Sequence, residues 1–337
     1  MKIIEDFQLK TLNTFNIEAK TKYFAEFENL IELKEVLNGE IFLKEKYCIL
    51  GGGSNILLTQ DFGGLIIKNN IKGITILLEN ETSVIVEVGA GEIWHDFVLW
   101  SVRKNLSGIE NLALIPGSVG ASPIQNIGAY GMEVKNTISK VTAVEIKSNT
   151  IKTFTNSKCK FEYRNSVFKG MLKNKFIITK VEFILNKEPL NKTTYGEIED
   201  ELNSLNLEKN PKNISTAVIN IRKRKLPDPK SLGNSGSFFK NPIIENTKYN
   251  KLKEDFPKIV GYKVSETKTK VAAAWLIDNA GFKGCRVGDA GVHKKQALVL
   301  VNYGNASGLE IIALAKKIQS SIRKKYNINI QPEVTIL

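Results

Sequence analysis

The sequence predicts an α+β protein of two domains, and three observations lead to this fold class. The chain has 337 residues, of which 42% are hydrophobic, enough for more than one buried core. Short apolar and β-branched runs alternate with helical patterns over residues 1–190. A polar stretch at 186–213 then separates this region from the shorter remainder of the chain. This change of composition indicates a domain boundary near 190/191.

The first region contains strands and one clear helix. Runs rich in Ile, Val and Leu predict strands at 46–50, 56–58, 64–68, 83–88, 141–146 and 176–185. A helix is expected at 93–104, because Trp94, Phe97, Val98 and Val102 recur on one face. The glycine-rich segment 51–55 follows the first of these strands directly.

The second region is expected to contain three helices and a final strand. Its predicted helices cover 214–224, 271–280 and 309–326, and a final strand covers 328–337. Pro227 and Pro229 would end the first helix, and Gly281 would provide the C-terminal cap of the second. Ser307 and Glu310 have the spacing of a capping box, which predicts where the third helix begins.

The composition of the chain limits the kinds of functional site that it can contain. The three cysteines, Cys48, Cys159 and Cys285, are far apart, which is typical of buried thiols in a reducing cytoplasm. Only two histidines occur, His95 and His293, so a histidine-rich metal centre is not expected, and we assign neither a role. The N-terminal residues lack the apolar run of a signal peptide, and no apolar stretch is long enough to span a bilayer.

The net charge of +13 has two interpretations. A basic surface can bind nucleic acid or small polyanions such as nucleotides. The lysines are scattered along the chain, which favours a bias of composition over a binding surface. The run Arg222–Lys225 is either the solvated end of a helix or, with the loop 233–242, part of a diphosphate pocket.

Residues 111–132 form the most unusual stretch, because they include no charged side chain although 25% of the chain is charged. Two prolines and four glycines interrupt it, which argues against a membrane span and against regular secondary structure. A long neutral loop of this kind usually lies against a ligand and offers backbone groups to it. The segment 51–55 (GGGSN) is either a second such loop that binds phosphate or a tight turn.

Several motifs, taken in order, resemble one family. They are LGGGSN at 50–55, IPGSVGASPIQNIGAYG at 115–131, FEYRNSVFK at 161–169, KLPDP at 225–229, GNSGSFFKNP at 233–242, AAAWLID at 272–278, VHKKQALVLVN at 292–302 and QPEV at 331–334. Together they resemble the UDP-N-acetylenolpyruvoylglucosamine reductases, flavoenzymes of peptidoglycan precursor synthesis. The segment 194–196 further resembles the subclass in which a tyrosine loop covers the substrate.

The resemblance implies a fold and a cofactor. Residues 1–190 would form an FAD-binding domain of the vanillyl-alcohol-oxidase type, with lobes at about 1–73 and 74–190. Residues 191–337 would form a smaller α/β substrate-binding domain, whose last strand carries Glu333 back to the flavin site. FAD would be bound without a covalent bond, since the loop 51–55 contains neither His nor Cys. The expected FAD-binding residues are Gly51, Gly52, Gly53, Ser54, Asn55, Pro116, Gly117, Ser118, Gly120, Ser122, Asn126, Gly128, Ala129, Tyr130 and Gly131.

The resemblance also implies catalytic roles. Arg164 would bind the substrate carboxylate, where negative charge builds up during reduction by NADPH. Glu333 would assist, either protonated or bridged to Arg164 or water, because a bare carboxylate would repel this charge. Ser237 would donate a proton to the substrate, helped by Lys225 or a water relay. Ser235 lies nearby, but the motif GSFFKNP at 236–242 places the role on Ser237. The expected substrate-binding residues are Tyr195, Lys225, Asn241, Lys270 and Gln296.

Two other functions stay open from the sequence. A flavoprotein of the same superfamily could act on a different substrate, although 225–242 and 331–334 both resemble the reductase's substrate site. A basic nucleic-acid-binding protein would instead be colourless and would bind in a salt-dependent way. The reductase interpretation implies a cytoplasmic monomer with no nucleic-acid partner and no membrane insertion.

Overall fold

The computed structural model describes residues 2–337 and consists of two compact units. Unit 1 comprises the residues up to Phe7, Thr21–Gly52 and Gly63–Arg224. Unit 2 comprises Gln8–Lys20, Gly53–Phe62 and Lys225–Leu337. The last boundary therefore falls at 224/225 and not at the expected 190/191.

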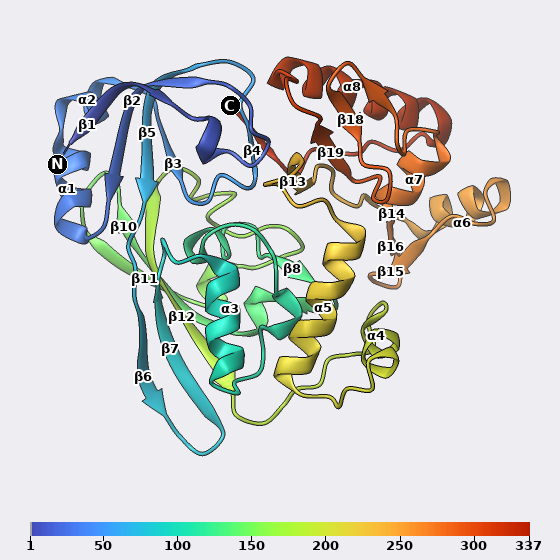
Figure 1. Ribbon diagram of the computed structural model, residues 1–337, viewed down its shortest axis with the longest axis horizontal. Coiled ribbons are helices and arrows are strands. Elements are labelled where there is room, and N and C mark those ends of the chain that lie inside the picture. Colours follow the sequence, from blue (N-terminus) through green and yellow to red (C-terminus); the bar gives the residue numbers. More distant parts are fainter. Residues whose placement is uncertain (1) are drawn as a thin grey trace. The chain divides into compact units, whose positions relative to one another are not determined.

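The reason for this difference is helix α5 (Pro211–Lys225), which belongs by its packing to unit 1 (Figure 1). Its apolar face is buried in the core of that unit through Ile214, Ala217, Val218 and Ile221. The polar stretch before it is a connection that also holds the short helix α4 (Ile198–Ser204).

Unit 1 contains two sheets. The first has the order β1-β2-β5-β3, with β3 parallel to β5. Its strands are β1 (Ile3–Gln8), β2 (Lys20–Phe27), β5 (Phe62–Asn69) and β3 (Tyr47–Leu50). Helices α1 (Leu30–Asn38) and α2 (Glu40–Lys44) pack Leu33, Leu37 and Phe42 into its core.

The second sheet has the order β11-β10-β12-β7-β6 and is antiparallel throughout. Its strands are β6 (Ile74–Glu79), β7 (Ser83–Gly89), β10 (Ile138–Glu145), β11 (Ile151–Thr155) and β12 (Phe176–Asn186). Val84, Val86 and Val88 are buried on one face of β7, as the alternation in the sequence predicts. Helix α3 (Trp94–Arg103) shares this core with α5, and Figure 1 shows both helices beside the sheet.

The neutral stretch between α3 and β10 has little regular structure. It contains the short 3₁₀ turns η2 (Glu110–Leu112) and η3 (Val119–Ala121) and the two-residue strands β8 (Gly128–Ala129) and β9 (Met132–Glu133). Further 3₁₀ turns are η1 (Lys10–Leu12), η4 (Val134–Asn136) and η5 (Ser157–Cys159).

Unit 2 is built on the sheet β13-β19-β18-β17 and a second sheet, β14-β16-β15. The first consists of β13 (Gly233–Ser237), β19 (Val299–Asn302), β18 (Ala290–Val292) and β17 (Arg286–Val287). The second consists of β14 (Ile243–Glu245), β16 (Lys268–Val271) and β15 (Gly261–Lys263). The helices are α6 (Asn246–Asp255), α7 (Ala273–Asn279) and α8 (Gly308–Tyr326).

Two predicted helix ends are confirmed in unit 2. Gly281 takes a left-handed conformation with φ +81° directly after α7, and its N–H donates to the Asp278 carbonyl at 2.9 Å. The capping box of α8 is present, with the Ser307 hydroxyl accepting from the Glu310 N–H at 3.2 Å. Helix α7 begins later than expected, because Val271 ends strand β16.

The expected strand at 328–337 is wrong in extent. Only β20 (Thr335–Ile336) pairs regularly, in parallel with β4 (Ile56–Leu57). The residues before β20 make isolated backbone contacts instead, such as the bridge between Pro332 and Phe239. Proline lacks the N–H that a continuous ladder would need.

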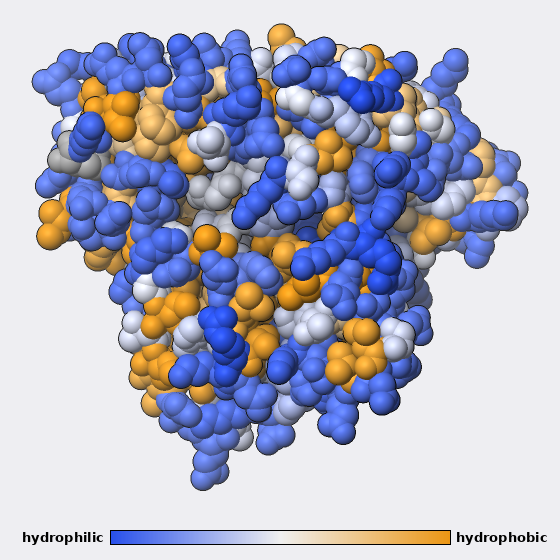
Figure 2. All heavy atoms as spheres, viewed as in Figure 1, coloured by the Kyte–Doolittle hydropathy of each residue, from blue (hydrophilic) through white to orange (hydrophobic). Residues whose placement is uncertain are grey.

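Figure 2 shows hydrophilic residues over most of the face in view, with hydrophobic residues in small separate patches. No described helix combines the length and the apolar character that crossing a bilayer requires.

Candidate active site

The neutral loop of unit 1 is held against the turn that joins β7 to α3. The N–H groups of Val119 and Gly120 donate to the carbonyls of Glu92 and Ala90, each at 2.8 Å. The Trp94 N–H donates to the Gly117 carbonyl at 3.0 Å. The loop is therefore a fixed element of unit 1.

The first two glycines of the segment 51–55 pack directly on this loop. A Cβ atom at Gly52 would lie 2.9 Å from the Gly117 Cα, and one at Gly51 would lie 2.4 Å from the Ser118 Oγ. Real Cβ atoms essentially never approach so closely. Glycine is required at position 52, because the backbones of the two segments lie against each other there, whereas a Cβ at Gly51 would meet the Ser118 side chain.

The segment 161–169 holds the other side of the neutral loop. Arg164 donates from Nη2 to the Gly128 carbonyl at 2.7 Å. The Ser166 hydroxyl donates to the Ile124 carbonyl at 2.6 Å, and Lys169 Nζ donates to Gln125 Oε1 at 3.2 Å. The structure thus brings the predicted catalytic arginine to the predicted cofactor loop.

Asn126 and Tyr195 have different positions around this loop. The Asn126 amide donates to Glu133 Oε2 at 3.1 Å and to the Glu162 carbonyl at 3.0 Å, so its side chain stabilises the loop's own shape. Tyr195 is half exposed and lies next to Gly131, where an added Cβ would be 3.1 Å from the tyrosine's Cβ. Tyr195 therefore packs beside the end of the neutral loop.

His95 supports the start of the neutral loop. Its Nδ1 accepts a hydrogen bond of 3.0 Å from the Leu114 N–H, and Leu114 has a left-handed φ of +59°. Burial is the largest cause that lowers the pKa of His95, Arg222 and Lys223 lower it further, and Asp96 opposes them. Because only a neutral imidazole can accept through Nδ1, the neutral form is the one that the fold uses.

The stability of the protein should therefore fall as the pH drops below the ordinary histidine pKa of 6.5. Because the pKa of His95 is lower in the folded protein than in the unfolded chain, the unfolded chain binds more protons at mildly acidic pH. The stabilisation is therefore complete above pH 6.5 and is lost as the pH falls through the pKa of His95 in the folded protein. Urea midpoints at pH 7.5 and 5.5 would measure the loss. His95→Gln should reduce it, and the double variant His95→Gln/His293→Gln should reduce it more, because burial also lowers the pKa of His293. An unchanged pH dependence in both variants would contradict this role.

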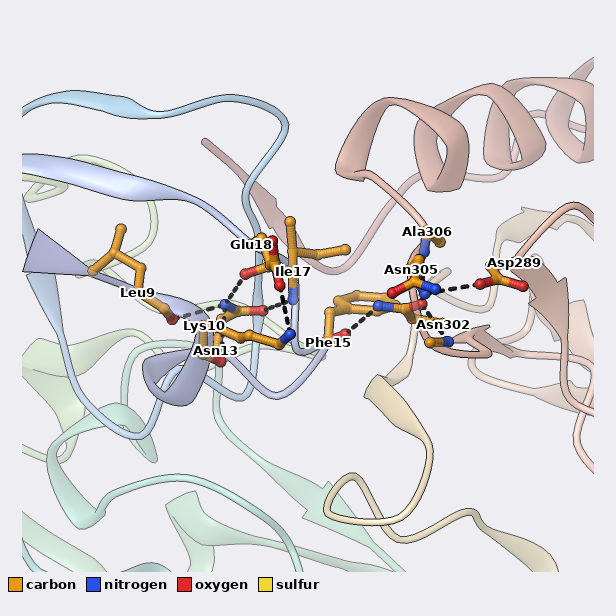
Figure 3. A network of polar contacts seen from close by, with 11 residues as sticks. Leu9, Lys10, Asn13, Phe15, Ile17, Glu18, Asp289, Asn302, Asn305 and Ala306 are labelled. Carbon is orange, nitrogen blue, oxygen red and sulfur yellow. Dashed lines mark hydrogen bonds and ion pairs between the residues drawn. The ribbon is translucent and has the colours of Figure 1, made fainter.

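In unit 2, the remaining part of the glycine-rich segment packs on residues 9–17. A Cβ at Gly53 would lie 1.8 Å from the Leu12 carbonyl oxygen, and the Thr14 N–H donates to the Gly53 carbonyl at 3.1 Å. Figure 3 shows how the Asn13 amide ties this turn together through the Leu9 and Ile17 carbonyls, at 2.9 and 3.0 Å. The same turn is fixed to strand β19, because Asn302 donates to the Phe15 carbonyl at 3.0 Å (Figure 3).

Strand β13 carries Ser237, the predicted proton donor, and the neighbouring Ser235. The pairing with β19 shifts register between Asn234 and Ser237, and Gly236 within this bulge has φ +70° with open space beside it. Ser235 is buried, whereas Ser237 is exposed. A bulge re-aims side chains along a strand, and here it turns Ser237 outward while Ser235 stays in the core.

Glu333 lies beside this strand in unit 2. Its N–H donates to the Phe238 carbonyl at 2.7 Å, and its carbonyl accepts from the Asn55 amide at 3.3 Å. The backbone of Glu333 is thus fixed between the residue after Ser237 and the end of the glycine-rich segment.

The other predicted substrate residues of unit 2 lie on separate elements. Asn241 Oδ1 accepts from the Ala273 N–H at the start of α7, at 2.9 Å. Gln296 Oε1 accepts from the Leu298 N–H at 3.3 Å, and Lys270 Nζ lies 6.0 Å from the centre of the Tyr262 ring. Lys225 is the last residue of α5 and is partly buried.

The residues of unit 1 fit a cofactor that is held by neutral groups. The loop places backbone groups and no charged side chain at the contact between 51–52 and 117–118. Within the part of the chain that the structure describes, the buried Ser122 hydroxyl has no hydrogen-bond partner. Across residues 2–337, no group of three or more His, Cys, Asp or Glu side chains is arranged to hold a metal ion.

Sequence reasoning missed Arg222 and His95. The sequence suggested that Arg222 is part of a solvated helix end or of a diphosphate pocket, but its Nε is buried. The spacing Ile214, Val218, Arg222 places it on the same face as the buried residues of α5, and this signal could have identified it. No comparable pattern marks His95 as a partner of a loop backbone.

The chain matches two protein families and is similar over its whole length to named proteins. Residues 228–337 match the family described as UDP-N-acetylenolpyruvoylglucosamine reductase, C-terminal domain, and residues 24–154 match the family described as FAD binding domain. The chain is 51% identical over 340 residues to UDP-N-acetylenolpyruvoylglucosamine reductase of Flavobacterium johnsoniae, with all of both chains covered. It is 44% identical over 338 residues to that of Amoebophilus asiaticus, again with all of both chains covered.

A crystal structure of UDP-N-acetylenolpyruvylglucosamine reductase from Thermus caldophilus has the same fold. It superposes with a TM-score of 0.69 at 22% identity and covers 99% of this chain and 98% of its own. The predicted fold class, an FAD-binding domain with a smaller α/β domain, is confirmed. The chain belongs to the UDP-N-acetylenolpyruvoylglucosamine reductases, a family of FAD-containing oxidoreductases.

Proposed function

We propose that this chain reduces the enolpyruvyl ether of UDP-N-acetylglucosamine to the lactyl ether, UDP-N-acetylmuramate, with NADPH as reductant and FAD bound non-covalently. The observation that carries the proposal is the 51% identity to a named reductase over the whole chain. In the overall balance, NADPH loses a hydride to C3 of the enolpyruvyl group and becomes NADP⁺, while C2 gains a proton. FAD, when bound, relays the hydride between NADPH and the substrate.

Arg164 stabilises the negative charge that develops on the substrate carboxylate. Its hydrogen bond to the Gly128 carbonyl fixes the guanidinium at the neutral loop before substrate binds. A preorganised donor aimed at developing charge is worth about 10²–10³ in rate. The neutral loop and the segment 51–55 hold FAD through backbone groups, and neither segment contributes a charged side chain.

Ser237 donates the proton to C2, and Glu333 assists from the adjacent segment. The exposure of Ser237 supports this role, because a buried hydroxyl such as that of Ser235 could not reach a ligand. The uridine diphosphate is bound by Tyr195, Lys225, Asn241, Lys270 and Gln296, which supply cations, amides and an aromatic ring. We place the enzyme in the cytoplasm as a monomer, with the nucleotide sugar and NADPH as its ligands.

An anaerobic absorbance experiment tests the function. The purified protein should be yellow, lose its flavin absorbance with NADPH, and regain it when the enolpyruvyl nucleotide is added. UDP-N-acetylglucosamine, which lacks the double bond, should not restore the colour. Bleaching without recovery by the enolpyruvyl nucleotide would favour another oxidoreductase of the superfamily, and a colourless protein retained on nucleic acid would favour the nucleic-acid-binding alternative.

A further inference from the structure

A cavity of about 560 Å³ in unit 2 is lined by helix α6 and by the end of helix α8. We call it the α6/α8 cavity, and its volume is within the range of sites for small molecules. The lining residues from α6 share one face of that helix and are Lys248, Lys251, Leu252 and Asp255. Those from α8 and its C-cap are Lys324, Lys325, Tyr326 and Asn327.

The lining of the α6/α8 cavity has an excess of positive charge. Four lysines and one aspartate leave a formal charge of +3. Two of the lysines come from α6 and two from the end of α8, so the charge is supplied from two elements. Within residues 2–337, Asp255 forms no ion pair with any of them. A concave surface that is lined by charges of one sign concentrates ligands of the opposite sign.

The four lysines have different local roles. Lys248 donates to the backbone carbonyl of the α8 C-cap, and Lys325 donates to the carbonyl of Asn279, which ends α7. Cations stabilise the C-terminal ends of helices, so these two lysines have a structural role. Lys251 and Lys324 are exposed and form no hydrogen bond or ion pair in the described part of the chain. Their ammonium groups are therefore available to a ligand.

Packed apolar side chains also line the cavity. Leu252 and Tyr326 are buried, and the Phe256 ring packs edge-on against the Tyr326 ring with 5.0 Å between their centres. The Asn279 amide donates to the Tyr326 hydroxyl at 2.9 Å and fixes this ring from behind. A lining that is already packed before a ligand arrives reduces the cost of ordering side chains on binding.

The α6/α8 cavity is distinct from the predicted substrate residues, none of which lines it. Helix α6 lies on one side of the sheet β14-β16-β15, where the Thr269 hydroxyl donates to Asn246 Oδ1 at 2.7 Å (Figure 1). Lys270 follows Thr269 in strand β16 and therefore points to the other side, where its Nζ lies 6.0 Å from the centre of the Tyr262 ring. A ligand in the cavity would thus lie across the sheet from Lys270.

We propose that the α6/α8 cavity binds a small anion that carries a diphosphate group, in addition to the ligands of the proposed reduction. A lysine ammonium binds phosphate as a point charge, and lysines on two helices suit a ligand with negative charge at two points. The concave form favours a small molecule, because a nucleic-acid strand follows an extended basic groove. The diphosphate is either free or carried on a nucleotide.

Isothermal titration calorimetry of the purified holoenzyme with inorganic pyrophosphate tests the proposal without turnover. Lys251→Gln/Lys324→Gln should weaken pyrophosphate binding about 10-fold, the combined value of two exposed ion pairs. Lys253→Gln/Lys258→Gln is the matched control, since it removes the same charge from exposed lysines that do not line the cavity. We expect the control to bind pyrophosphate as the unchanged protein does.

Amide hydrogen exchange locates the bound anion. Pyrophosphate should slow exchange at 246–256 and 322–327 in the unchanged protein and in the control, and should do so much less in Lys251→Gln/Lys324→Gln. Thermal unfolding of the two double variants should be the same, because none of the four substituted lysines has a hydrogen bond or an ion pair among the described residues. A loss of binding in a protein of unchanged stability is then a loss of the site and not of folding.

ADP separates the two sources of the diphosphate. Binding of ADP that is 10-fold tighter than that of pyrophosphate would identify a nucleotide, whose base and ribose add contacts to the apolar lining, whereas equal affinities would identify free pyrophosphate. The proposal is overturned if pyrophosphate does not bind, if both double variants lose affinity equally, or if protection from exchange is confined to other segments.

Discussion

Ser237→Ala should abolish reoxidation of the reduced flavin by the enolpyruvyl nucleotide while leaving flavin reduction by NADPH unchanged. The bulge in β13 turns Ser237 to the surface of unit 2, and the adjacent Phe238 carbonyl accepts from the Glu333 N–H. Removing a positioned proton donor typically costs about 10²–10⁴ in rate. Stopped-flow absorbance measures the two half-reactions separately, so a fault in FAD or NADPH binding would be visible in the first.

Ser235→Ala is the matched control for this experiment. Ser235 is in the same strand, but its hydroxyl is buried and has no hydrogen-bond partner among the described residues. Its loss should leave both half-reactions unchanged. Rapid reoxidation of the Ser237→Ala enzyme would remove Ser237 from the mechanism, and a slow Ser235→Ala enzyme would transfer the role to Ser235.

The regular elements of the fold could be predicted from local sequence. Strands β7 and β12 and helices α3 and α8 have clear periodicities and capping residues, and each lies within a few residues of the predicted range. The final strand could not be predicted in its true extent. Its hydrophobic pattern is that of a strand, but pairing depends on partners far away in the chain, such as β4.

The division into two units also could not be predicted from local sequence. The segments Gln8–Lys20 and Gly53–Phe62 pack with residues beyond 225, through contacts such as the Asn302 amide on the Phe15 carbonyl. These contacts join residues far apart in the chain, so local sequence does not show where the crossings lie. A polar linker does precede α5, but the buried face of that helix assigns it to unit 1.

The candidate site, too, could be predicted only in part from the sequence. The neutral stretch could be identified from charge alone, since a gap of this length in a charged chain is a composition signal. Which side chains hold it depends on three-dimensional contacts. Arg222 and Lys223 are adjacent in sequence, but the Nε of Arg222 is buried in unit 1, whereas Lys223 is exposed. The helical period places only one of them on the buried face.

Gly52→Ala should yield a folded protein that no longer retains FAD. The added Cβ would lie 2.9 Å from the Gly117 Cα and 3.2 Å from the Gly117 carbonyl carbon, and both are backbone atoms that cannot rotate away. Relieving the overlap must separate 51–52 from 117–118, at a cost of about 1–3 kcal/mol to the packing of the two loops. Because both loops are proposed to bind the cofactor, their separation removes the arrangement that holds it.

Flavin absorbance per mole of purified protein, followed by titration with FAD, measures the effect. Gly63→Ala is the matched control, since a Cβ there would meet only the Lys46 Cε at 3.9 Å, the far end of a flexible side chain. We expect Gly63→Ala to be purified with its full flavin content and Gly52→Ala to be colourless, although its thermal unfolding stays cooperative. A Gly52→Ala protein with full flavin content would show that the contact between these loops is a matter of folding alone, and the cofactor would then have to be sought elsewhere in the chain.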